Sequence, residues 1–283
     1  MMKRTVFILL FAFAFSVAFS QEHLPTKADY DSFYNTTTLV VMDPSPMSDF
    51  NFKIKDVMKN NWTITDYEFI TEQEFEDKKN NPAYSFLLTT TVTFDRDKTK
   101  ARYTFLSLLM GEDNSSVRDM PDLCSIPLSY LRVEDDSYAY KLDAFIRFIQ
   151  DHVKLMTEHP ELIKANVFKY YNKNVQSLKG KTLYLVAEDV EPVVNTVKKI
   201  SKVYPYEVKF VSRDEVMEAI ESKDPDVVFL HKVGPEGTRY KARCYKFLIG
   251  AADAKLYYFD YHMITPKKRD YLLAKDVKKM SGH

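Results

Sequence analysis

The sequence is short of glycine and has no excess of charge of either sign. It contains 6 Gly among 283 residues, and 40 Lys and Arg balance 40 Asp and Glu. So few glycines leave little room for a phosphate-binding loop, and no GxGxxG, P-loop, GxSxG or HExxH motif occurs. The balanced charge gives no sign of the basic face that a duplex nucleic acid requires. The sequence therefore indicates no catalytic residues, no cofactor-binding residues and no nucleic-acid partner.

Cysteine is also scarce. The 2 cysteines, Cys124 and Cys244, match neither a CxxC redox pair nor a zinc-binding spacing. A bridge between them would close a long loop and contribute about 3–5 kcal/mol. The alternating patterns, however, place each cysteine on a strand of a different sheet. We therefore expect two buried free thiols, with a disulfide as the alternative.

A long hydrophobic run occurs at the N-terminus and nowhere later. Lys3 and Arg4 precede an apolar run from Thr5 to Phe19, and Ala18-Phe19-Ser20 has small residues where a signal peptidase reads them. The run is shorter than the ~20 apolar residues of a membrane span. We therefore expect residues 1–20 to be a signal peptide cleaved before Gln21, with an uncleaved anchor as the alternative. The mature chain would then be periplasmic or secreted, without a transmembrane segment.

The sequence does contain a long-period internal repeat. Each half opens with a short apolar run, Thr38–Met42 in the first and Thr182–Val186 in the second. In each half a second strand then leads into a capping box, which begins at Thr71 in the first half and at Ser212 in the second. In this motif a hydroxyl and a carboxylate three residues later satisfy the free N–H groups of a helix start. Such an echo is typical of a duplicated domain.

Both halves predict the order β-α-β-α-β-β-β-α. Strands joined through helices favour parallel pairing, whereas strands joined by tight turns pair antiparallel. We therefore expect an α/β protein (α+β mixed) of two tandem domains, each a mixed five-stranded sheet packed by helices. The expected segments are an extended lead-in, a first repeat domain, a helical linker and a second repeat domain, at 21–36, 37–157, 158–180 and 181–283.

The second half carries residues that suggest a known module. Arg213–Val216 follows its second strand, Asp224–Val228 enters its third strand, and Gly250–Leu256 connects its last strands. In this order it resembles the periplasmic α/β module at the N-terminus of TolB and in the lipoproteins LpoB and CsgG. The likeness covers roughly 100 residues of each half and implies a fold alone. The thioredoxin fold, which also ends in a hairpin and a helix, is the alternative, without redox chemistry because CxxC is absent.

Three residues of the second half suggest a metal site. Asp260 and His262 are two residues apart on a predicted strand and therefore share one of its faces. With His231 on a nearby strand, they offer two imidazoles and a carboxylate, a set suited to a transition metal. The alternative is a solvent-facing polar side of a half-buried sheet.

The same strand is rich in aromatic residues. Alternation places Tyr257, Phe259 and Tyr261 on one face and Tyr258 on the other. Exposed rings would form a binding face for a glycan or a peptide, whereas buried rings would support a helix in the core. We expect core support first and keep the binding face as the alternative.

With no catalytic signature, the sequence favours a non-catalytic, tandem-domain binding or assembly scaffold of the cell envelope. Sheet edges and the groove between the copies are natural surfaces for an envelope protein partner. The alternative is a small-ligand or metal-binding protein, or a hydrolase, with its site in the cleft between the two repeats. Polar groups that converge on that cleft would favour the alternative.

Overall fold

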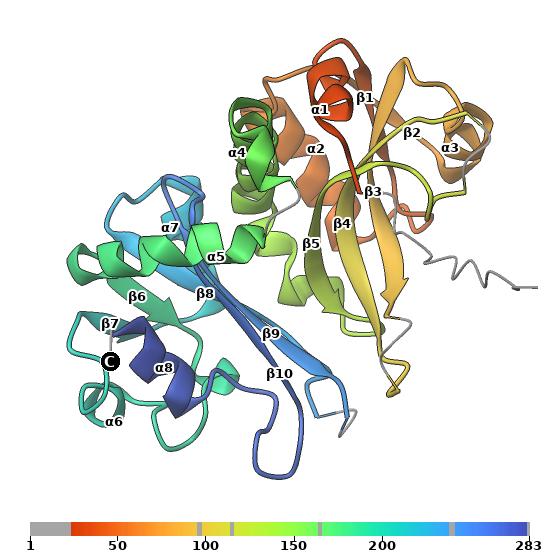
Figure 1. The fold of residues 1–283 in the computed structure, drawn as a ribbon. Helices are drawn as coiled ribbons and strands as arrows, with labels where there is room; N and C mark the ends of the chain where they lie inside the picture. Colours follow the sequence, from red (N-terminus) through yellow and green to blue (C-terminus); the bar gives the residue numbers. More distant parts are fainter. Residues whose placement is uncertain (1–23, 95–97, 114–115, 164–165, 238–240, 282–283) are drawn as a thin grey trace, which may run out of the picture.

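The structure, a computed structural model, shows an α/β protein with two mixed five-stranded sheets packed by helices, as predicted (Figure 1). The predicted signal peptide at 1–20 lies outside the described part of the chain. Within the described part, no helix is both long and apolar enough to cross a membrane. The described residues are 24–94, 98–113, 116–163, 166–237 and 241–281.

The first sheet has the strand order β2-β1-β3-β4-β5. β1 is parallel to β2 and β3, and the pairs β3–β4 and β4–β5 are antiparallel. The strands are β1 (Thr37–Val41), β2 (Asp66–Ile70), β3 (Tyr84–Thr93), β4 (Arg102–Met110) and β5 (Asp122–Tyr130). The helices of this half are α1 (Lys27–Phe33), α2 (Asp49–Asn61), α3 (Glu72–Lys78), η1 (Asp135–Ser137), η2 (Ala139–Lys141) and α4 (Leu142–Glu158).

The second sheet repeats this arrangement strand for strand, in the order β7-β6-β8-β9-β10. β6 is parallel to β7 and β8, and β8–β9 and β9–β10 are antiparallel. The strands are β6 (Thr182–Leu185), β7 (Val208–Phe210), β8 (Val227–Val233), β9 (Arg243–Gly250) and β10 (Leu256–Met263). The helices between and after them are η5 (Ala187–Asp189), α6 (Val197–Ile200), α7 (Arg213–Glu221) and α8 (Ala274–Met280). Equal order and equal directions confirm the expected tandem sheets.

The two capping boxes form as predicted. The backbone N–H of Thr71 donates to the Glu74 carboxylate at 2.8 Å, and the N–H of Ser212 donates to the Glu215 carboxylate at 2.8 Å. Their hydroxyls accept from the N–H groups of Glu74 and Glu215, both at 3.2 Å. Each box fixes where the helix after the second strand begins.

The lead-in at 21–36, expected to be extended, instead contains α1. Thr26 caps this helix in a box with Asp29, whose carboxylate accepts from the Thr26 N–H at 2.7 Å. Tyr30 and Phe33 are buried, and the Tyr30 hydroxyl donates to the Leu123 carbonyl at 2.8 Å. The expectation was wrong because the polar composition hid a capped turn whose two aromatic residues reach the core.

The segment expected as a helical linker also covers a sheet edge. It forms η3 (Pro160–Leu162), α5 (Val167–Tyr171) and η4 (Asn172–Gly180). The Asn172 side chain donates to the Phe259 carbonyl at 3.0 Å and accepts from the Phe259 N–H at 2.7 Å. Asn174 donates to the Leu256 carbonyl at 2.9 Å. These amides satisfy backbone groups on the outer edge of β10, which an uncovered edge strand would leave open to pairing.

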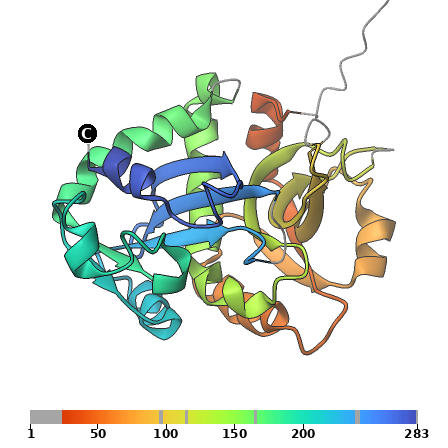
Figure 2. The ribbon, with the colours of Figure 1, turned by 90° about the horizontal axis from the view of Figure 1, so that it is seen from below.

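One hydrophobic core runs through both domains, with α4 between the sheets. Phe145 on α4 lies against His231 on β8, with 4.7 Å between ring centroids. Arg147, two residues further along α4, donates to the carbonyls of Ala251 and Ala252 at 2.8 and 2.6 Å. In Figure 2 the blue strands of the second sheet lie to the left of the yellow and olive strands of the first sheet.

A second contact joins the domains at the N-terminal end of β4, where Tyr103 lies. The Tyr103 hydroxyl donates to the Arg243 carbonyl at 3.0 Å and accepts from the Arg243 N–H at 2.6 Å. The rings of Tyr103 and Tyr245 meet edge to face at 5.3 Å. Contacts on α4 and on β4 together hold the two sheets in a fixed relation, and they fix the shape of the space between them.

Candidate functional site

The two faces of the second sheet carry different chemistry. Strand pairing aligns His231 with Phe247 and Phe259 in one row, and Lys232 with Lys246 and Asp260 in the next. Because neighbouring rows point to opposite faces, the aromatic row faces α4 and the first domain, whereas the charged row faces α8. The faces are called here the domain face and the α8 face.

His231 belongs to the domain face and is fully buried. Its Nε2 lies 2.8 Å from the Pro127 carbonyl of β5, and therefore carries the proton and donates. Burial lowers the pKa of His231 well below its ordinary value, and the nearby Lys141 lowers it further. A neutral imidazole that bridges two domains is a structural hydrogen-bond donor.

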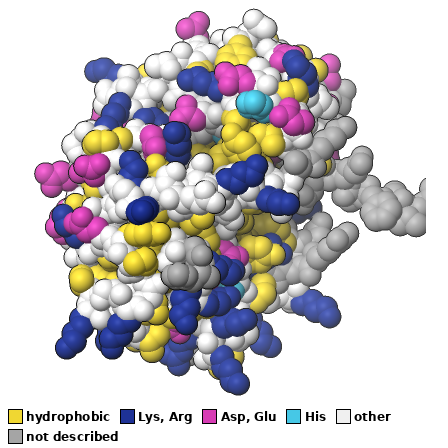
Figure 3. Space-filling view, turned by 60° about the vertical axis from the view of Figure 1, so that its left-hand side comes forward, with side chains coloured by type: hydrophobic (Ala, Val, Ile, Leu, Met, Phe, Trp, Pro, Cys, Tyr) yellow, Lys and Arg dark blue, Asp and Glu magenta, His cyan; other side chains and the backbone are white. Residues whose placement is uncertain are grey.

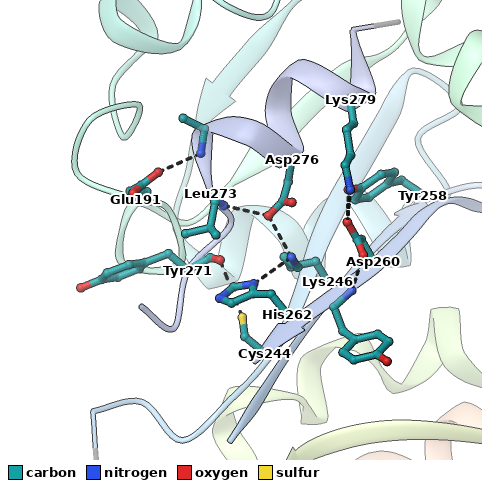
Figure 4. Close-up of polar contacts among 12 residues, drawn as sticks. Glu191, Cys244, Lys246, Tyr258, Asp260, His262, Tyr271, Leu273, Asp276 and Lys279 are labelled. Atoms are coloured by element: carbon teal, nitrogen blue, oxygen red, sulfur yellow. Dashed lines mark hydrogen bonds and ion pairs between the residues drawn. The ribbon is translucent and has the colours of Figure 1, made fainter. Parts of the chain in front are cut away.

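His262 lies on the α8 face, in a buried network with Lys246 and Asp276 (Figure 4). The Lys246 ammonium donates to the Asp276 carboxylate at 2.8 Å and to His262 Nδ1 at 3.0 Å. Since Nδ1 accepts, His262 Nε2 carries the proton and donates to the Arg269 carbonyl at 2.8 Å. Burial lowers the pKa of His262, and the Lys246 charge adds to the effect.

This network fastens the last helix to the sheet. The Asp276 carboxylate also accepts from the Leu273 N–H at 3.1 Å, at the start of α8. Asp260 lies at the border of the network and accepts from Lys279 of α8 at 2.6 Å and from the Tyr258 hydroxyl at 3.2 Å (Figure 4). Burial opposes the charge of Asp260, but Lys279 and Lys246 hold its pKa below the ordinary value.

The structure therefore does not bring the three predicted metal ligands together. Asp260 and His262 share a face, as expected, but His231 points to the opposite face of the sheet. Across the described residues, no group of three or more His, Cys, Asp or Glu side chains is placed to hold a metal ion.

The aromatic strand is divided between the same two faces. Phe259 and Tyr261 belong to the domain face, and Tyr261 is 47% exposed. The pairing of β9 and β10 is irregular between Leu256 and Tyr258. As a result Tyr257 joins the core on the α8 side, with its hydroxyl donating to Asp253 at 2.9 Å. Two of the three residues of the predicted binding face thus lie together, and the third supports the core.

Phe259 and Tyr261 line a groove of about 1040 Å³ between the two domains, called here the domain groove. The walls come from β5, α4, α5, β9 and β10. Phe168 of α5 stacks on Phe259 with 3.8 Å between ring centroids. The other apolar lining residues include Phe94, Phe105, Cys124, Ile126, Phe148, Met156, Leu162, Tyr245, Phe247, Ile249 and Leu256. Figure 3 shows hydrophobic side chains at the surface beside Lys and Arg side chains.

Cations dominate the free charge at the border of the domain groove. Lys169 and Lys173 are exposed, lie four residues apart, and have no carboxylate partner within the described part of the chain. Arg243 lies over the Phe94 ring at 3.9 Å from its centroid. The carboxylates at the border are already engaged, because Asp122 accepts from Ser125 at 2.6 Å and Asp260 accepts from Lys279.

A polar pair lies in the wall of the groove. His152 Nδ1 and the Tyr171 hydroxyl are 2.8 Å apart. Burial lowers the pKa of His152 to about 4, and burial also raises the pKa of Tyr171. Both side chains are therefore neutral near pH 7, and a ligand would meet hydrogen-bonding atoms there rather than a charge.

Sequence reasoning missed most of this groove. Phe148, Phe168 and Tyr171 come from helices that had been assigned to packing or to a linker. The available signal was the i, i+3 spacing of Phe168 and Tyr171, which places both rings on one side of a short helix. Cys124 lines the groove and Cys244 lies on the α8 face, and both are free buried thiols, as predicted.

Comparisons with protein-family models, with curated proteins and with solved structures found no match to this chain. The resemblance of the second half to the module of TolB, LpoB and CsgG therefore stays a prediction.

Proposed function

We propose that this protein binds a small amphipathic ligand, with an apolar body and an acidic group, in the domain groove. The observation that carries the proposal is the groove itself, a largely apolar space of about 1040 Å³ with walls from both domains. Ligand sites in proteins are mostly apolar, lie preferentially between domains and hold a few placed polar groups. This choice follows the second of the two functions expected from the sequence, a small-ligand site between the repeats.

The apolar body of the ligand would lie against aromatic rings. Phe247 and Phe259 have ring centroids 4.9 Å apart, and Phe168 stacks on the outer side of Phe259. Burying apolar ligand surface contributes about 25 cal/mol for each Å² removed from water. Rings held by both a helix and a sheet need little reordering when the ligand enters, so less of that free energy is lost.

The acidic group would lie at the α5 border. Lys169 and Lys173 are on one side of the α5–η4 segment, and the nearby carboxylates of Asp122 and Asp260 already accept hydrogen bonds. An anion therefore meets two cations there that pair with no carboxylate among the described residues, whereas a ligand cation would meet repulsion. Location remains part of the proposal: the N-terminal run predicts export, which would place the groove outside the cytoplasm.

Binding of three ten-carbon probes tests the proposal. Decanoate, decanol and decylamine share an apolar chain and differ in the charge of the head group. Isothermal titration should show decanoate binding more tightly than decanol, and decylamine most weakly. The double variant Lys169→Gln/Lys173→Gln should weaken decanoate by about fivefold and leave decanol unchanged, because an exposed ion pair contributes about 0.2–1 kcal/mol.

Two controls keep this test specific. Lys55 and Lys59 are exposed lysines four residues apart on α2, remote from the groove, so Lys55→Gln/Lys59→Gln should change no affinity. Phe259→Ala should weaken decanoate and decanol equally, whereas Phe52→Ala, at a ring 55% exposed on α2, should weaken neither. Failure of all three probes to bind, or an equal loss for Phe52→Ala, would overturn the proposal.

A further inference from the structure

A second cavity, of about 1160 Å³, lies in the second domain and shares no lining residue with the domain groove. It opens where β6 and β7 end: Val186–Asp189 follows β6, and Phe210, the last residue of β7, continues into Val211–Arg213. It is called here the switch pocket.

Chain topology makes this a favourable place for a ligand. β6 lies between β7 and β8 in the sheet. The chain therefore passes from β6 to β7 on one side of it, and then crosses back over β6 to form β8 on the other side. The helices of the two crossovers cover opposite faces, since Ile200 of α6 packs with Leu183 and Val228, while Ile220 of α7 packs with Val227 and Phe229. Ligands of open α/β sheets bind outside the carboxyl ends of the strands at such a change of direction.

The switch pocket contains a buried ammonium group. The Lys232 side chain is 3% exposed, and its Nζ lies 3.5 Å from Asp189 and 3.4 Å from Asp270. Burial opposes the charge, but the two carboxylates hold the pKa of Lys232 above its ordinary value. Both distances are long for a hydrogen bond, and Nζ makes none within the described residues. A buried ammonium with unused donors is costly, and an acceptor from a ligand would relieve that cost.

Asp270 is held in position by the backbone opposite it. Its carboxylate accepts from the Glu236 N–H at 2.7 Å. It also fills the space beside Gly234, where a Cβ atom would lie 1.8 Å from Asp270 Oδ1. Glycine at 234 is therefore required for the carboxylate to approach the backbone and reach Lys232. The arrangement around Lys232 is held from two sides.

The lining mixes donors and acceptors with little net charge. Four carboxylates, those of Glu188, Asp189, Glu236 and Asp270, stand against three cations, those of Arg213, Lys232 and Arg269. The rings of Phe210 and Tyr271 also border the space. An anion is further disfavoured at the start of α7, because the Glu215 carboxylate already accepts the Ser212 N–H there. Such a lining fits a ligand without net charge that donates and accepts hydrogen bonds at several points.

We infer that the switch pocket binds a neutral saccharide. Each sugar hydroxyl both donates and accepts, so one ring can accept from Lys232 and donate to Asp189 and Glu188. Hydrogen bonds that involve a charged partner are the stronger ones. The C–H face of a sugar ring can lie against Phe210 or Tyr271. This site shares no lining residue with the domain groove, so a test of saccharide binding does not depend on the function proposed for the groove.

The first domain gives an internal reference for this inference. Its parallel pairing aligns Ser85 with Thr38, as Val228 is aligned with Leu183 in the second. Counting four residues along β3 and β8 from these pairs places Thr89 where the second domain has Lys232. The same position of the repeat thus carries a neutral hydroxyl in one copy and a buried ammonium in the other.

Saturation-transfer NMR on the full chain tests the inference, with maltose and N,N′-diacetylchitobiose as probes and with phosphate and glycine for comparison. A saccharide should show transfer and bind, whereas phosphate and glycine should not. Glu188→Gln and Arg269→Gln change exposed lining residues that leave the fold intact, and each should weaken saccharide binding by about 3- to 10-fold.

Matched substitutions outside the pocket provide the control. Glu207→Gln and Arg118→Gln change exposed residues of the same types and should leave saccharide affinity unchanged. Lys232→Met should abolish binding, and its melting temperature shows whether it folds. Binding of phosphate or glycine alone, absence of any saccharide binding, or equal effects of the control variants would overturn the inference. Decanoate binding should persist in Glu188→Gln and Arg269→Gln, which separates this result from the domain groove.

Discussion

The two sheets have the same strand order and the same strand directions, yet equivalent rows inside them differ in chemistry. Thr89, Leu106 and Ile126 pair across β3, β4 and β5. The corresponding row of the second sheet is Lys232, Lys246 and Asp260. The fold thus requires only that this row be accommodated, and an uncharged row does so at lower cost than a charged one.

The charged row of the second sheet extends from the last helix to a pocket. Buried ionisable groups cost free energy unless they are fully paired, and the first sheet avoids that cost because its equivalent row carries none. In the second domain they hold α8 at one end of the row and border the switch pocket at the other. The charged row therefore connects the packing of α8 with the wall of the switch pocket.

Removal of a cation from the charged row should destabilise the protein more than any other change considered. Lys246→Met leaves the Asp276 carboxylate buried and without its cation, and should lower the free energy of unfolding by about 3–5 kcal/mol. Leu106→Met, at the equivalent position of the first sheet, conserves volume and should cost less than about 1.5 kcal/mol. Urea denaturation followed by circular dichroism gives both values.

A double variant sharpens this result. In Lys246→Met/Asp276→Asn the second change removes the unpaired charge and keeps an oxygen that can accept from the Leu273 N–H. It should recover part of the lost stability. If Lys246→Met lowers the free energy of unfolding no more than Leu106→Met does, the charged row adds no stability beyond that of an uncharged row. The proposed difference between the two sheets would then be wrong.

Acid should produce the next largest effect. Burial lowers the pKa of His152 from 6.5 to about 4, and the pKa values of His231 and His262 are also lowered. Between these values the unfolded chain binds protons that the folded chain does not, so stability is complete above pH 6.5 and falls as the pH is lowered toward 4. For His152 the full loss is about 3 kcal/mol.

Denaturation series at pH 7.5, 6 and 5 measure this slope. His152→Gln should flatten it, since the uncharged side chain removes one of the titrating groups. His159 lies at the surface, with Nδ1 3.2 Å from Glu161 Oε1, and provides the substitution control: His159→Gln should change the slope less than His152→Gln does. A pH-independent free energy of unfolding would contradict the assignment of neutral imidazoles in the folded chain.

Much of the fold could be predicted because it depends on local patterns. Apolar runs, capping boxes at Thr71 and Ser212, and helix-ending prolines gave the strands and their order along the chain. Pairing directions followed from the lengths of the connections. The exception was α1, where the capping box at Thr26 spans a segment too short and polar to show a helical period.

The candidate site could be predicted only in part, because it depends on register between strands. Alternation correctly separated Tyr258 from Phe259, but the irregularity beside Leu256 moved Tyr257 to the other face. The predicted metal site failed for a related reason: His231 and His262 lie on strands separated by β9, and a shift of one residue in pairing reverses a face. No local pattern fixes that register.

The smallest predicted effect tests whether the two domains, so alike in topology, unfold as one. Tyr103→Phe removes the hydroxyl that bonds to both backbone groups of Arg243, and should lower the free energy of unfolding by about 1–2 kcal/mol.

Two signals report on unfolding. The fluorescence of Trp62, the single tryptophan of the chain, reports on the first domain, whereas far-UV circular dichroism reports on both domains. Since one hydrophobic core crosses the interface, the two signals should share a midpoint in the wild type and shift together in the variant. Tyr67→Phe, on β2 away from the interface, is the matched control and should shift neither signal. Two separate transitions in the wild type would instead mean that each sheet folds alone, and the domain groove would then lie between bodies free to move.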